Sequence, residues 1–162
     1  MPFRDFLNSI TPIKWYDFFI DVFLLLFVLL FVYTASSKLF EFDAFKRSIH
    51  AQPLAGWLKD TIIYSIPPLE LIIAVLIMFP RTKLWGVIAF ATMMILFTGY
   101  TALVTVNYYA KQPCSCGGVF RYLTWKEHLL LNSVFLIAAI ISVIKLGREN
   151  KNKTFKETIS FS

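Results

Sequence analysis

Residues 18–35 read FFIDVFLLLFVLLFVYTA, an almost unbroken run of large apolar side chains. At about 1.5 Å per residue, a helix of this length extends roughly 27 Å, close to the roughly 30 Å thickness of a bilayer's hydrocarbon core. Backbone N–H and C=O groups find no water in that core, and a helix satisfies them within the segment itself. The run therefore predicts a membrane-spanning helix.

Three further apolar blocks follow, at residues 62–79, 84–106 and 129–146. Each is long enough to cross a bilayer as a helix when its flanking residues contribute. The expected fold is all-α, an integral membrane four-helix bundle that forms a single domain over residues 1–162. Residues 147–162 are polar and predict a frayed cytoplasmic tail.

The composition agrees with a membrane protein. Hydrophobic residues make up 57% of the chain and charged residues 16%, against roughly 45–50% and about 25% in soluble domains. The mean hydropathy is +0.65, which excludes a soluble globular enzyme. The formal net charge is +6, and the basic residues are scattered between and after the apolar blocks. This distribution argues against nucleic-acid binding, and membrane lipid is the expected surrounding.

The distribution of lysine and arginine predicts the orientation. The N-terminus, the turn at residues 81–83 and the tail carry slightly more of these residues than segments 37–61 and 107–128. Under the positive-inside rule, both termini are then cytoplasmic, and the two longer loops lie on the outer side of the membrane.

The first of these loops has a pattern of its own. Between residues 38 and 51, apolar side chains recur at near-helical spacing with charged side chains between them. This pattern is typical of an amphipathic helix that lies along the membrane interface. We expect such a helix between the first and second spans.

The second loop holds both cysteines of the chain, in the sequence PCSCGG at residues 113–118. Pro113 and the two glycines favour a tight turn, so both sulfur atoms can reach one partner. A disulfide between Cys114 and Cys116 would be strained and would remove little chain entropy. Strain makes a disulfide easier to reduce, which favours thiol–disulfide exchange over a structural role. Two incidental cysteines at the membrane interface are the alternative.

Trp125, His128 and Asn132 are spaced to lie on one face at the start of the fourth span. His128 is a candidate catalytic residue, because an imidazole can take a proton from a thiol or stabilise a thiolate. An ordinary interfacial histidine is the alternative. Metal ligation by His128 with Cys114 and Cys116 is a weaker hypothesis, since the ligand set is incomplete, and no metal site is predicted.

Glu70 lies deep inside the second apolar block, two residues after the proline pair at 67–68. A carboxylate is costly inside a membrane, so it should face the bundle, remain protonated or find a partner such as Lys38 or His50. The functional interpretation is a proton relay or a quinone contact, and the structural one is an interhelical hydrogen bond. Glu70, Lys38 and Tyr100 are the candidate cofactor-binding residues, with a quinone as the candidate cofactor.

Four motifs together resemble the DoxX superfamily, and most closely its MauE-like branch. They are SSKL at 36–39, PPLEL at 67–71, the cysteine motif at 113–118 and WKEH at 125–128. The resemblance covers roughly residues 20–145.

The resemblance implies a four-helix protein of the bacterial inner membrane. The methylamine-utilisation branch is associated with a thioredoxin-like partner and with disulfide formation in an exported enzyme subunit. It therefore implies thiol–disulfide traffic at Cys114 and Cys116. Lys38, Glu70 and His128 match family-like positions.

Two hypotheses of function follow. In the first, the chain is an inner-membrane thiol–disulfide redox protein, either an oxidoreductase or a redox-active subunit. Its cysteine pair on the outer loop exchanges disulfides with an exported thioredoxin-like protein, and a quinone or a second protein completes the electron path. In the second, the chain is a non-enzymatic accessory or scaffold subunit of a larger membrane complex, whose 17 phenylalanines and four tryptophans help to pack partner helices.

Overall fold

The computed structural model describes residues 12–52, 54–106, 108 and 124–160. Within these residues the secondary structure consists of five helices, without strands. The helices are α2 (Pro12–Phe40), α3 (Phe42–His50), α4 (Gly56–Met78), α5 (Lys83–Thr105) and α6 (Trp125–Ser160).

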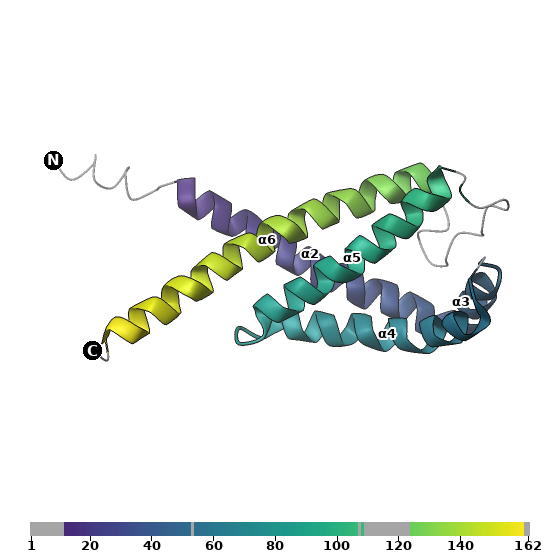
Figure 1. The fold of residues 1–162 in the computed structure, drawn as a ribbon, viewed down its shortest axis with the longest axis horizontal. Coiled ribbons are helices and arrows are strands. Elements are labelled where there is room, and N and C mark those ends of the chain that lie inside the picture. The colour runs from purple at the N-terminus through teal and green to yellow at the C-terminus, as the bar shows by residue number, and fades with distance from the viewer. Residues whose placement is uncertain (1–11, 53, 107, 109–123, 161–162) are drawn as a thin grey trace.

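The four long helices run alternately up and down the bundle (Figure 1). Each of them, among the residues described, contains a segment long and apolar enough to cross a membrane. The expected all-α membrane helical bundle is confirmed. The helices α2, α4 and α6 begin several residues before the predicted spans at 18–35, 62–79 and 129–146. The start of α2, the turn between α4 and α5, and the end of α6 lie toward one end, and α3 lies at the other (Figure 1).

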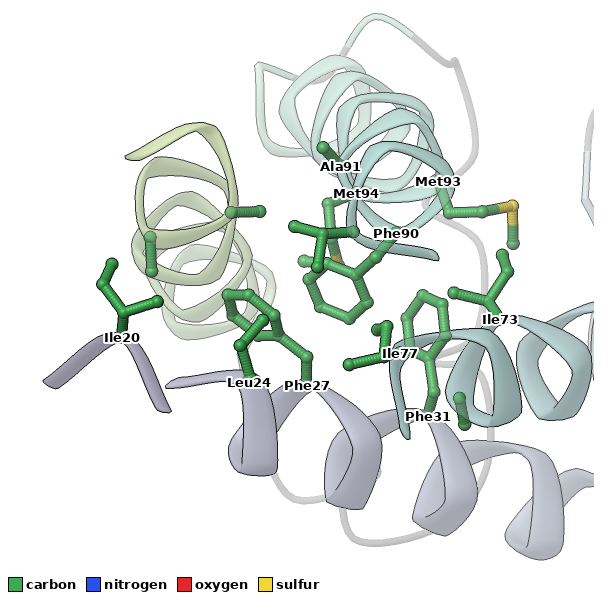
Figure 2. Packing of buried hydrophobic residues seen from close by; sticks show 14 residues of the cluster. Ile20, Leu24, Phe27, Phe31, Ile73, Ile77, Phe90, Ala91, Met93 and Met94 are labelled. Atoms are coloured by element: carbon green, nitrogen blue, oxygen red, sulfur yellow. The ribbon is translucent and has the colours of Figure 1, made fainter. Parts of the chain in front are cut away.

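Aromatic rings fill the centre of the bundle (Figure 2). The ring of Phe90 on α5 stacks on the ring of Phe27 on α2, with centroids 4.3 Å apart. The centroid of the Phe90 ring also lies 4.4 Å from that of Phe31. Ile73 and Ile77 of α4 are buried in the same cluster. Large apolar residues on the outer faces are exposed in the protein, for example Ile72 and Leu96, as expected for helices that contact lipid. The core therefore forms by packing of rings between helices.

Small residues allow the helices to approach closely. A Cβ atom on Gly86 of α5 would lie 2.7 Å from the backbone nitrogen of Ile77 on α4. On α6, the residues Ala138, Ala139 and Ser142 are buried. Helix association in lipid depends on such close van der Waals contact, because lipid chains are as apolar as the side chains themselves.

The segment between the first two spans differs in part from its prediction. The amphipathic pattern begins at Lys38, but α2 continues through Phe40, and the separate helix α3 begins only at Phe42. Its apolar side is covered by protein, with Phe45 buried against Ile63 of α4. Lys38 therefore belongs to the first long helix, where it pairs with Glu70 of α4, and not to the amphipathic helix.

The polar tail also differs from the prediction of a frayed segment, because α6 continues to Ser160. Near the end of its apolar part, Lys145 forms ion pairs with Asp17 of α2 and with Glu149. Its ammonium also lies 5.3 Å from the ring centroid of Tyr16. These contacts tie α6 to the start of α2.

Candidate functional site

A cavity of about 340 Å³ lies between the helices, and its lining includes Phe45 and Ile49 of α3. This helix lies at one end of the bundle (Figure 1). All five described helices contribute to its lining. Most of the wall is apolar, including Phe97 and Met94 of α5 and Ile66 of α4. This size and character fit the usual ligand site between the helices of a bundle.

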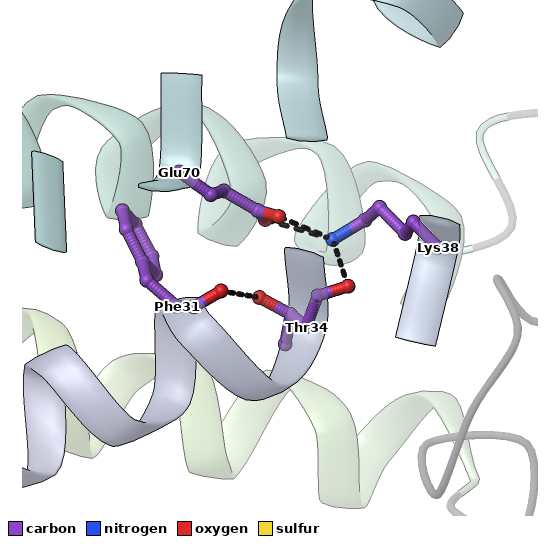
Figure 3. A network of polar contacts seen from close by, with 4 residues as sticks. All are labelled: Phe31, Thr34, Lys38 and Glu70. Atoms are coloured by element: carbon purple, nitrogen blue, oxygen red, sulfur yellow. Dashed lines mark hydrogen bonds and ion pairs between the residues drawn. The ribbon is translucent and has the colours of Figure 1, made fainter. Parts of the chain in front are cut away.

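Lys38 and Glu70 form an ion pair in the wall of this cavity (Figure 3). The Lys38 ammonium donates to both carboxylate oxygens of Glu70, at 2.8 and 2.9 Å. It also donates to the backbone oxygen of Thr34, one turn earlier, at 3.3 Å. The Glu70 side chain is 1% exposed and the Lys38 side chain 19%. Of the two partners proposed for Glu70, Lys38 is the one the structure shows, whereas His50 lies 3.8 Å from Asp60.

The local sequence explains how the pair forms. Lys38 is one turn of helix beyond Thr34, so its long side chain can run back along α2 and place its charge inside the bundle. Glu70 is in the middle of α4, which remains helical through Pro67 and Pro68. Separating these charges inside a membrane would leave each without compensation, so the pair holds α2 and α4 together.

A second polar contact crosses the cavity at Tyr100. Its hydroxyl donates to the side-chain oxygen of Gln52, in the turn after α3. Gln52 is 2% exposed, although it lies outside any helix. Sequence reasoning missed Gln52, because a glutamine in a polar loop gives no local sign that it will be buried.

The face predicted at the start of α6 does line the cavity, with Trp125, His128 and Asn132. The rings of Trp125 and His128 are nearly parallel, with centroids 6.4 Å apart. Asn132 is buried, and its amide nitrogen lies 3.4 Å from the hydroxyl oxygen of Thr101. Their side chains thus share the cavity with Lys38 and Glu70.

Hydrogen bonds fix where α6 begins. The backbone and hydroxyl of Thr124 donate to a carboxylate oxygen of Glu127, at 2.8 and 2.9 Å. The backbone N–H of Glu127 in turn donates to the hydroxyl oxygen of Thr124, at 3.4 Å. This reciprocal arrangement is a capping box, which satisfies backbone donors at a helix start. The hydroxyl of Thr105 at the end of α5 lies 3.4 Å from the backbone oxygen of Trp125. The C-terminal end of α5 and the N-terminal end of α6 are therefore in contact beside the cavity.

Cys114 and Cys116 lie outside the described residues. The nearest described residue before them is Tyr108, which follows α5. The nearest described residue after them is Thr124, which precedes α6. In the part of the chain that the structure covers, no group of histidine, cysteine, aspartate and glutamate side chains has an arrangement that could hold a metal ion.

The described residues therefore offer an apolar chamber with polar groups set into its wall. The Lys38 ammonium is a hydrogen-bond donor, and the Glu70 carboxylate can hold or release a proton. Such groups are rare inside membranes and usually mark a ligand or proton site.

Comparison with protein families gives a match to the model of methylamine utilisation protein MauE over residues 16–145. No match was found among curated proteins or among solved structures. The matched region begins within α2 and ends within α6, and it includes the cysteine segment and every residue of the cavity named above. Together with the four apolar helices, it identifies a multi-pass membrane protein. The chain belongs to the MauE family.

Proposed function

We propose that this protein is a thiol–disulfide exchange component of the inner membrane. The name of the matched family supports an accessory role in methylamine utilisation. Within that role, Cys114 and Cys116 form a reducible disulfide that accepts electrons from an exported thioredoxin-like protein. The observation that supports the proposal is that the described end of α5 and start of α6, between which the cysteine pair lies in the sequence, are in contact beside a cavity with buried charges.

The exchange proceeds by thiolate attack. A partner thiolate attacks one sulfur of the Cys114–Cys116 disulfide, and the other sulfur leaves as a thiolate. The second partner thiol then attacks the resulting mixed disulfide, so the partner is oxidised and the membrane pair becomes a dithiol. The proposed role of His128 is to accept or return a proton during these steps, since it lies in the first turn of the helix that follows the cysteine segment in the sequence and its side chain lines the cavity.

Trapping the mixed disulfide tests the proposal. In Cys114→Ala and Cys116→Ala variants, the remaining thiolate can attack the disulfide of the oxidised partner, which is the exchange run in reverse, and one partner sulfur leaves as a thiolate. Because no neighbouring membrane thiol is present to displace the partner, the mixed disulfide should persist. We expect at least one single variant to accumulate an adduct in acid-quenched cells, visible on a non-reducing gel and absent after reduction. The double Cys114→Ala/Cys116→Ala variant is the matched control and should form none.

A different result in these variants would overturn the proposal. If neither single variant traps a thioredoxin-like protein and the double variant supports methylamine growth fully, thiol exchange is excluded. The alternative of a scaffold subunit in a larger membrane complex would then account for the family's role.

A further inference from the structure

The cavity wall contains a few polar side chains that a purely structural gap between helices would not require. The Lys38–Glu70 pair is set into an otherwise largely apolar lining, with Tyr100 among the other polar groups. Burying an ion pair in this position gives weak evidence for stability alone, because apolar residues of similar volume often serve as well. The pair therefore suits recognition of a ligand that is apolar over most of its surface and polar at one end.

The lining also reaches the outer surface of the helices. Leu96 of α5 is 63% exposed and Tyr33 of α2 is 42% exposed, yet both line the cavity. Residues on these outer faces contact lipid in a membrane-spanning bundle. A molecule dissolved in the bilayer can therefore enter from the side without crossing a charged surface.

We propose that this cavity binds a lipophilic quinone, with a ring carbonyl that accepts a hydrogen bond from the Lys38 ammonium. The bond from Lys38 to the Thr34 carbonyl is long, at 3.3 Å, and is the one that a ligand carbonyl replaces. The bonds to Glu70 are shorter and keep the charge paired. Phe97 and Trp125 supply aromatic surface for a flat ring.

This inference rests on the proposed thiol function for its redox role. Reoxidation of the Cys114–Cys116 dithiol releases two electrons and two protons as the disulfide forms. A quinone accepts both electrons and both protons and leaves as a quinol. Glu70 provides a carboxylate beside the ring through which a proton can be delivered.

Binding is measured on the purified full chain in detergent, by titration with a decyl-substituted benzoquinone. Trp125 lines the cavity, whereas Trp15, Trp57 and Trp85 are largely exposed and are not among its lining residues. Quinone binding should therefore quench tryptophan fluorescence saturably, and Trp125→Phe should remove the saturable part. Absence of saturable quenching in the wild-type protein overturns the proposal.

The Lys38→Met/Glu70→Met double variant tests the polar wall. It removes both charges together and retains unbranched apolar side chains of similar length, a change that buried ion pairs often tolerate. Loss of a charged hydrogen bond should weaken quinone binding about tenfold or more. Lys126→Met is the control, because Lys126 is an exposed lysine of α6 outside the lining. Equal affinity in the double variant and the wild type contradicts the proposal.

A second variant changes a lining residue on the outer face of α5 and leaves the ion pair intact. Leu96→Trp should narrow the cavity and weaken binding, whereas Leu103→Trp, on the same helix and outside the lining, should not. If decanol restores the tryptophan fluorescence at concentrations no higher than the half-saturating concentration of the quinone, the cavity only accepts acyl chains, and the proposal fails. Because binding needs no thiol chemistry, its failure is distinct from failure to trap a thioredoxin-like partner.

Discussion

Lys38 and Glu70 depend on each other at the level of single residues. Glu70 is almost completely buried, and its carboxylate accepts two hydrogen bonds from one ammonium group. Lys38→Met alone would leave a buried carboxylate without a counter-charge, and we expect it to lower the free energy of unfolding by about 3 kcal/mol. Thermal unfolding in detergent, followed by circular dichroism, measures the change.

The single variants Lys38→Met and Glu70→Met and the double Lys38→Met/Glu70→Met variant form a double-mutant cycle. The double variant should be within about 1 kcal/mol of the wild type, because no unpaired charge remains. Lys126→Met should be neutral as a matched surface control. Additive losses from the two single substitutions would show that the two side chains do not stabilise each other.

At the level of elements, Gly86 sets the approach of α5 to α4. A methyl group at this position would lie 2.7 Å from a backbone nitrogen and 2.8 Å from a backbone carbon of α4. Backbone cannot rotate away as a side chain can, so Gly86→Ala should force the helices apart. We expect a loss of about 1–3 kcal/mol in the free energy of unfolding, measured by the same thermal unfolding.

Gly99→Ala on the same helix is the control. A Cβ atom at Gly99 would meet nothing within 4 Å, and alanine is the better helix former. We expect this variant to be as stable as the wild type or slightly more so. Equal destabilisation at both glycines would mean that backbone flexibility, and not the contact between α4 and α5, determines the effect.

At the level of the whole molecule, α3 and the α4–α5 turn lie at opposite ends of the bundle (Figure 1). Phe45 and Ile49 of α3 line the cavity, so the cavity is at the end away from that turn. The proposed orientation places the cavity end outside the cell's inner membrane. In a variant lacking Cys114 and Cys116, Asp60→Cys should react with an impermeant thiol reagent in intact spheroplasts. Arg81→Cys in the α4–α5 turn should react only after the membrane is permeabilised.

Both test positions are exposed in the structure, so accessibility within the protein does not limit either reaction. If Arg81→Cys is labelled from outside and Asp60→Cys is not, the orientation in the membrane is the reverse of the one proposed. The cysteine pair would then face the cytoplasm, where an exported partner could not reach it.

Much of the architecture is readable from the amino-acid order, because crossing a bilayer is a local requirement. Runs of apolar residues such as 18–35 predict the spans without knowledge of their neighbours. Local spacing likewise places Trp125, His128 and Asn132 on one face, and the cost of burying Glu70 predicts that it has a partner. The cysteine motif and its proposed chemistry also come from local sequence and stay a prediction.

Contacts between distant helices decide the rest. Hydropathy alone leaves Lys38 and His50 as equal partners for Glu70, and packing of α2 against α4 selects Lys38. The placement of the turn after α3 beside α5 brings Gln52 to Tyr100, a contact between residues 48 positions apart. The cavity is the space left when five helices settle against one another, so its lining depends on their relative positions in three dimensions. Local sequence patterns carry no record of those positions.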